Sequence, residues 1–248
     1  MQMTAAAFVF FPSLAVGSFL NVVVSRLPLG RSISVPRSAC PHCGTPIRSR
    51  DNIPLLSYLL LRGRCRDCRA SIGWRYPAVE LATAVLAAAC VADFGFSLHA
   101  LAGAVFCAAL VAISATDIER RIVPNRVVLP ASVAVLALML VWRPSVEWPL
   151  AGFGAALFLL IAALAYPRGM GMGDVKLALL LGVAVGRAVP VALMVGMLSA
   201  LAPSVVLFAR HGAAARKMAI PFAPFLALGG VVGLFAGPAI VHWYLHTL

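Results

Sequence analysis

Charged residues are scarce in this sequence of 248 residues, where they make up 11% of the chain while hydrophobic residues make up 62%. Soluble domains carry about 25% charged residues, so this composition excludes an ordinary soluble globule. Acidic residues are the scarcest, with eight Asp and Glu against 20 Lys and Arg. The basic excess does not indicate a nucleic-acid partner, because no basic helix or basic-aromatic surface stands apart from the apolar sequence.

The sequence also lacks the signatures of several enzyme classes. No Ser or Cys nucleophile with a partner His is visible, and the glycines at 169, 171 and 173 do not complete a dinucleotide-binding loop, because Asp174 replaces the third glycine of that pattern. The first apolar run has no charged residue before it, so it lacks the basic region of a secretory signal and is expected to be a retained span.

Long apolar runs are what the sequence has instead, and they predict an all-α polytopic membrane protein with about eight transmembrane helices. Several runs are shorter than the roughly 20 residues that cross a bilayer, so we expect some helices to extend into polar flanks. The region 177–185 is the weakest candidate. The eight runs cover residues 5–24, 78–91, 98–116, 127–142, 150–166, 177–185, 189–209 and 222–245. We divide the chain into a first span (1–24), a polar loop (25–77) and a membrane domain (78–248).

The positive charges predict the orientation of these helices. Of the 20 cations, 18 fall in alternate loops, and only Arg143 and Arg187 fall in the others. By the positive-inside rule, the loops with 18 cations face the cytoplasm. We expect these cations to contact the anionic lipid of the inner leaflet, which attracts positive charges next to the membrane.

The polar loop at 25–77 contains two Cys-x-x-Cys pairs, Cys40 with Cys43 and Cys65 with Cys68, separated by 21 residues. Four thiolates at this spacing suit a tetrahedral structural zinc site, and the metal replaces the core that such a short segment lacks. An unmetallated reduced loop and a pair of disulfides are the alternatives, and the reducing cytoplasmic face disfavours the disulfides.

Two acids stand out because an ionisable group near a membrane span is costly. Asp117 closes the third span and Asp174 opens the sixth, and the predicted topology places both at the cytoplasmic ends of their helices. Two neighbouring carboxylates can supply a general base and a general acid, which is the chemistry of aspartic proteolysis. In the alternative interpretation the two acids only cap helix ends and pair with Arg120, Arg121 or Lys176.

Glu80 lies just inside the second span, where it must face protein, an arginine or water. A structural ion pair and a functional acid are both open interpretations. A different class of protein also fits these residues: a zinc-binding membrane assembly or transport protein, in which the acids relay protons. Acids near the bilayer midplane would be expected for a pure transporter, whereas Asp117 and Asp174 are predicted at helix ends.

Taken together, the chain resembles the prepilin peptidases, the type IV leader peptidases of bacterial membranes that belong to the Gly-x-Gly-Asp aspartic proteases. The similarity extends over nearly the whole chain. It rests on Gly17–Val22, both Cys pairs around Asn52–Tyr58, Tyr76–Glu80, Asp117 seven residues before Pro124, Gly171–Leu177 and Ile220–Ala227.

The resemblance implies cleavage of the leader from type IV prepilins or pseudopilins at the cytoplasmic face of the bacterial cytoplasmic membrane, with Asp117 and Asp174 at the catalytic positions. It also implies N-methylation of the new terminus with S-adenosylmethionine as the methyl donor. The zinc loop and Glu80, the candidate cofactor-binding residue, lie in the matching region. An enzyme that retains only methyl transfer is a further alternative, and it would not need both aspartates.

Overall fold

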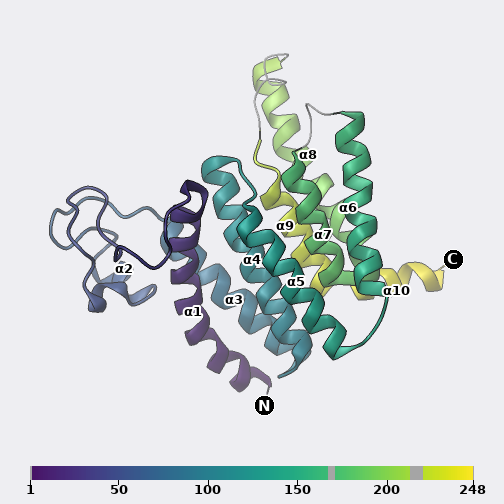
Figure 1. The fold of residues 1–248 in the computed structure, drawn as a ribbon, viewed down its shortest axis with the longest axis horizontal. Coiled ribbons are helices and arrows are strands. Elements are labelled where there is room, and N and C mark those ends of the chain that lie inside the picture. The colour runs from purple at the N-terminus through teal and green to yellow at the C-terminus, as the bar shows by residue number, and fades with distance from the viewer. Residues whose placement is uncertain (1, 167–170, 213–219, 248) are drawn as a thin grey trace. The chain divides into compact units, whose positions relative to one another are not determined.

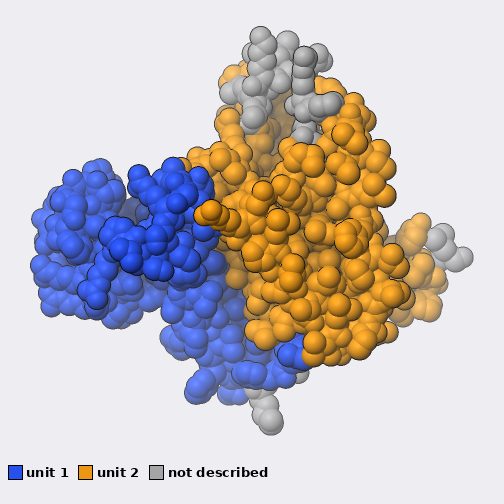
Figure 2. Space-filling model, viewed as in Figure 1, with its two compact units in different colours: residues 1–100 blue, residues 101–248 orange. Residues whose placement is uncertain are grey.

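The computed structural model describes residues 2–166, 171–212 and 220–247. Figure 1 shows an all-helical chain, and within the described ranges no β-strand is present, only two isolated bridges that join Ala39 to Pro46 and Arg64 to Ser71. The chain forms two compact units, residues 1–100 and 101–248, which Figure 2 shows in separate colours. The all-α class expected from the sequence is therefore confirmed.

Unit 1 contains one long helix before the polar loop and one after it. Its elements are α1 (Gln2–Arg26), η1 (Leu27–Leu29), η2 (Ser49–Asn52), α2 (Leu56–Leu60) and α3 (Arg75–Phe94). Helix α4 (Leu98–Arg120) begins at the end of this unit and belongs mostly to unit 2. The other elements of unit 2 are α5 (Asn125–Trp142), α6 (Glu147–Ala165), α7 (Met172–Val185), η3 (Gly186–Ala188), α8 (Val189–His211), α9 (Ala223–Phe235) and α10 (Gly237–Thr247).

Six stretches among the described residues are long and apolar enough to cross a membrane, or seven if the bent pair α9 and α10 is one span. The expected number was about eight, and the difference lies in α7 and α8, which together count as one stretch over Met172–His211. As expected, several helices extend into polar flanks, for example α3, which begins at Arg75. The chain is a multi-pass membrane protein.

The chain reverses direction between α7 and α8. Leu181 and Val185 of α7 lie near Gly230 and Gly233 of α9 in the same order along the chain, so these two helices are parallel. Along α8 and α9 the order is opposite, because Gly196 lies near Leu226 while Ala192 lies near Gly233. Helix α7 is therefore a separate short helix of 14 residues, below the length that spans a bilayer by itself.

Close helix packing in both units depends on residues without side chains. In unit 1, a Cβ atom at Gly17 of α1 would lie 2.6 Å from the Glu80 Cα atom of α3, so the two backbones touch there. In unit 2, a Cβ atom at Gly152 of α6 would lie 2.5 Å from Val183 of α7. Small residues that allow such approach are the usual basis of helix association in membranes, where lipid is as apolar as the side chains.

Candidate functional site

Asp117 lies buried in the last turn of α4, with 7% of its surface exposed. The helix ends directly afterwards, because Arg121 adopts a left-handed φ of 55° while its N–H still donates to the Asp117 carbonyl at 2.8 Å. The Asp117 Oδ2 atom accepts a hydrogen bond of 3.0 Å from the backbone N–H of Ala223, which is 106 residues further along the chain. The carboxylate is thus held by the first residue of α9.

Helix α9 is built to receive a carboxylate at its start. Pro224 occupies its first turn, where a missing N–H costs no helical hydrogen bond and the fixed φ suits the helix. The free N–H groups and the positive end of the helix dipole favour an anion at this point. The sequence analysis assigned no role to Ala223. The local signal there was Pro224, because proline is common in the first turn of a helix.

Asp174 lies in the first turn of α7 and is partly buried. Its Oδ2 atom accepts a weak hydrogen bond of 3.4 Å from the Gly171 N–H, and its own N–H donates to the Gly171 carbonyl at 3.0 Å. A Cβ atom at Gly173 would lie 2.8 Å from the Val123 Cβ atom, so only glycine allows α7 to begin against the segment that leaves α4. Gly169, the first glycine of the sequence pattern, lies outside the described residues.

These contacts bring the two acids to one site in unit 2, and the Asp117 and Asp174 carboxylates are close enough to interact electrostatically. The pairing with Lys176 that the alternative interpretation allowed is not formed, and the Lys176 ammonium donates a 2.8 Å hydrogen bond to the Asn125 side-chain oxygen instead. Within residues 2–166, 171–212 and 220–247, no ion pair joins either aspartate to a lysine or arginine. Asp174 does cap α7, as the alternative interpretation expected.

Unit 1 holds a second candidate site, formed by Cys40, Cys43, Cys65 and Cys68. Their four Sγ atoms lie within 4.8 Å of one another, and the Sγ atoms of Cys40 and Cys68 are 3.8 Å apart. A tetrahedral zinc ion with Zn–S bonds of about 2.3 Å places its sulfurs about 3.8 Å apart. The donor set and spacing therefore fit a structural zinc ion, and all four cysteines are free rather than disulfide-bonded.

The two Cys pairs adopt the same local structure. In each pair the first cysteine N–H bonds to the carbonyl five residues on, from Cys40 to Thr45 at 3.0 Å and from Cys65 to Ala70 at 2.8 Å. In each turn the residue after the second cysteine has a positive φ, 72° at Gly44 and 61° at Arg69. Two matching turns that face each other are the geometry that the paired motif predicted.

The environment of the thiols favours unequal ionisation without a metal. The Thr45 hydroxyl, 3.3 Å from Cys43 Sγ, lowers the pKa of Cys43 to about 6. At Cys68 the Ala70 amide favours the thiolate, but burial and the neighbouring cysteines outweigh it and raise the pKa to about 12. Four thiolates cannot share this volume without a cation, and a divalent metal removes that conflict.

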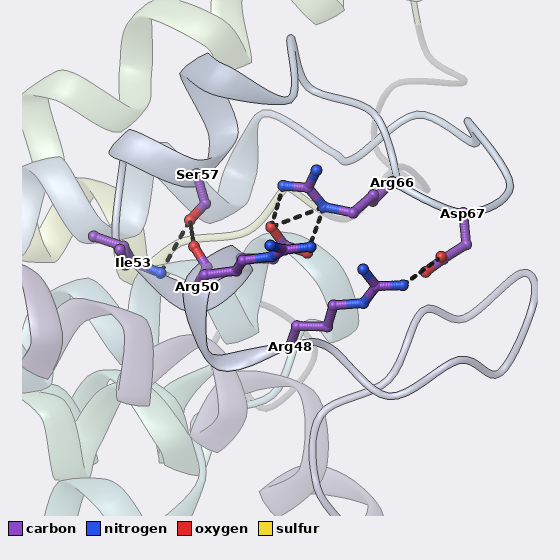
Figure 3. Close-up of polar contacts among 7 residues, drawn as sticks. Arg48, Arg50, Ile53, Ser57, Arg66 and Asp67 are labelled. Atoms are coloured by element: carbon purple, nitrogen blue, oxygen red, sulfur yellow. Dashed lines mark hydrogen bonds and ion pairs between the residues drawn. The ribbon is translucent and has the colours of Figure 1, made fainter.

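Ion pairs fasten the second Cys pair to the segment before α2. Arg66 donates to the Asp51 carboxylate through two nitrogens, with a shortest distance of 2.6 Å, and Arg48 contacts Asp67 at 3.3 Å. Figure 3 shows both arginines next to this segment, together with Ser57, whose hydroxyl donates to the Arg50 carbonyl at 3.0 Å. The hydrogen bond from Arg66 lowers the pKa of Asp51.

Glu80 anchors the polar loop to α3. Glu80 is buried, with 8% of its surface exposed, and its Oε2 atom accepts a 2.8 Å hydrogen bond from the Leu55 N–H, where the backbone has a φ of 56°. Nearby, the buried Asn21 side chain of α1 donates to the Tyr76 carbonyl at 3.0 Å. Among the residues that the structure describes, the partner of Glu80 is therefore a backbone amide and not an arginine. This hydrogen bond is a structural contact, and the sequence alone did not indicate it.

Fold and sites together define a polytopic membrane protein with a paired-carboxylate site in one unit and a four-cysteine site in the other. The model of the bacterial Peptidase A24 N-terminal domain matches residues 11–94, and the model of the type IV leader peptidase family matches residues 104–209. The chain belongs to the type IV leader peptidase family. No solved structure matches it.

Curated relatives match nearly the whole length of the chain. Three proteins called prepilin leader peptidase/N-methyltransferase illustrate this. The one from Burkholderia pseudomallei strain 1026b is 40% identical, over 93% of this chain and 85% of the relative. The one from Aeromonas hydrophila is 35% identical over 96% and 92%, and the one from Bacillus subtilis strain 168 is 35% identical over 98% of both chains. This membership supports the peptidase interpretation and not the proton-relay transport alternative.

Proposed function

We propose that this chain is a membrane-embedded aspartic endopeptidase that removes the leader of type IV prepilins or pseudopilins and then N-methylates the new terminus. The observation that carries the peptidase activity is the meeting of Asp117 and Asp174 at the ends of α4 and α7. The relatives' names and 34–40% identity support both activities. The names describe those proteins, and we extend their activities to this chain.

In the proposed peptidase step, one aspartate takes a proton from the attacking water and the other donates a hydrogen bond or a proton to the scissile carbonyl oxygen. No covalent enzyme intermediate is needed. The Ala223 N–H fixes one oxygen of Asp117, which leaves the other oxygen for water or substrate. Asp174 lies in a first helical turn beside glycines, where a substrate backbone can approach closely.

The four cysteines would hold zinc in a structural role, since all four tetrahedral positions are filled by protein thiolates and none is open for substrate. S-adenosylmethionine, when bound, supplies the methyl group. We propose that Glu80 serves this half of the reaction by fixing the polar loop through its hydrogen bond to Leu55, rather than through the acid-base site of unit 2.

We further propose that the protein lies in the bacterial cytoplasmic membrane with the carboxylate site and the 25–77 loop facing the cytoplasm. The support is the distribution of cations, 18 of them in alternate loops, and their expected attraction to anionic inner-leaflet lipid. Arg168, Arg216 and Lys217 contribute to this count and lie outside the described residues. Labelling of single introduced cysteines at Arg120 and Arg143 should give opposite sides.

The test of function is a single incubation with two readouts. Purified protein in detergent is mixed with a prepilin peptide that spans the cleavage site, with and without S-adenosylmethionine, and product masses are measured. We expect loss of the leader in both reactions and an added methyl group only with the methyl donor. Intact peptide in both reactions would contradict the peptidase assignment, and cleavage without methylation would restrict the protein to that one activity.

A further inference from the structure

The start of α7 is fixed by more than the glycine contact, and the additional contact comes from a side chain with no assigned role. Lys176 lies two residues after Asp174, and its ammonium donates a 2.8 Å hydrogen bond to the Asn125 side-chain oxygen. Asn125 is the first residue of α5, and 51 residues separate it from Lys176. The bond therefore joins two helix starts that are distant in sequence.

Asn125 lies close to Asp117 along the chain. Only residues 121–124 lie between the end of α4 and the start of α5. Within this segment Pro124 is buried, and Val123 is the residue on which Gly173 packs. The Lys176–Asn125 bond and the Gly173–Val123 contact thus involve residues on both sides of Asp174 in the sequence. They attach the start of α7 to the short segment after Asp117, through Val123, and to the first residue of α5.

We propose that Lys176 and Asn125 are positioning residues for the reaction, which form a clamp that sets the separation of the Asp117 and Asp174 carboxylates. This inference rests on the proposed peptidase function. The clamp also engages the Lys176 ammonium with a neutral amide oxygen. Residues i and i+2 lie on different faces of a helix, so Lys176 acts on Asp174 through the position of the helix start rather than by contact.

The clamp is expected to affect rate more than stability. The Lys176–Asn125 hydrogen bond is exposed, and exposed polar contacts contribute little to folding. The separation of two catalytic groups is far more demanding, because a displacement of about 1 Å can lower a rate by about a hundredfold. Loss of the clamp should therefore lower kcat by about tenfold to a hundredfold, with KM and the thermal unfolding midpoint nearly unchanged.

The experiment is a double-mutant cycle on cleavage of a prepilin peptide by the purified full-length protein. The variants are Asn125→Ala, Lys176→Met and the combination, with Lys176→Arg as the conservative change and Arg126→Ala as the matched control. Arg126 is an exposed cation next to Asn125, and its removal should leave kcat unchanged. Because the wild-type protein must cleave in the same assay, failure of the proposed function is separated from failure of the clamp.

A clamp predicts that both single variants lose the same fraction of kcat, and that the double variant is no worse than either one, because each change breaks the same bond. Partial recovery with Lys176→Arg would agree with this. Additive losses, or a normal kcat for Asn125→Ala beside a low kcat for Lys176→Met, would overturn the clamp and leave the lysine charge as the cause. Losses that only follow a lower unfolding midpoint would also overturn it.

Discussion

The two candidate sites are built in opposite ways. In unit 1 the cysteines lie in an exposed polar loop. The cluster of four Sγ atoms and a few ion pairs hold this loop together. In unit 2 the aspartates lie at the ends of long apolar helices, and backbone amides and close glycine contacts hold them. A site on a loop needs a cross-link of its own, whereas a site at helix ends takes its geometry from the packing of the helices.

This difference predicts how each site should respond to the loss of one of its functional side chains. Removing a ligand in unit 1 should abolish the local fold, because metal binding and folding are coupled in small sites. Removing a carboxylate in unit 2 should abolish chemistry and leave the fold intact, because the helices pack without it.

The largest effect is expected from Asp117→Asn and Asp174→Asn. Each change preserves shape but removes a group that must transfer a proton, so each should lower cleavage by at least about a hundredfold to ten-thousandfold. The measurement is the initial rate of leader loss by mass spectrometry. Asp93→Asn, at the exposed end of α3, is the matched control and should cleave normally. Near-normal cleavage by either aspartate variant would remove that residue from catalysis.

The next effect is expected from Cys40→Ser combined with Cys65→Ser, which removes one ligand from each pair. The purified protein should lose about one zinc ion per chain, measured by elemental analysis, and the loop should become sensitive to trypsin. Methyl transfer should fall more than cleavage. Replacing the buried Cys90 and Cys107 with Ala is the control and should retain the metal. Stoichiometric zinc in the double variant would contradict the ligand assignment.

The sequence indicated candidate residues for both sites, but not the contacts that support them. Rare acids at the ends of apolar runs and paired cysteines are local signals, and they led to Asp117, Asp174 and the four thiols as candidates. The Ala223 contact with Asp117 joins residues 106 positions apart and has no local signal. The apolar run at 222–245 forms two helices, α9 and α10, which meet at a bend of 68° that the sequence analysis did not predict. The Gly237–Pro238 dipeptide lies at this bend, and Gly-Pro dipeptides are a local signal for a break between elements.

A smaller effect, on stability rather than chemistry, is expected from Gly152→Ala in α6. The added methyl group would lie 2.5 Å from Val183 of α7, and overpacking of this kind costs about 1–3 kcal/mol. The unfolding midpoint in detergent should fall. Gly154→Ala, two residues further along α6, meets nothing within 4 Å and should be neutral or slightly stabilising. Equal midpoints for the two variants would contradict the tight α6–α7 packing.

The smallest effect is expected from Asp51→Asn, which breaks the ion pair with Arg66 in the loop. Arg66 is 41% exposed, so the loss should weaken zinc retention by less than about fivefold in competition with a chelator, and less still at high salt.

The pH dependence of this effect follows from the lowered pKa of Asp51. The ion pair stabilises the loop at any pH above the ordinary carboxyl pKa of about 3.9. This contribution is lost only as the pH falls through the lower pKa of the folded state. The difference between wild type and variant should therefore be the same at pH 6 and pH 8. Both proteins should lose zinc as the pH falls, because protons compete for the thiolates. A difference that grows between pH 8 and pH 6 would show that another titrating group, and not this pair, fastens the second Cys turn.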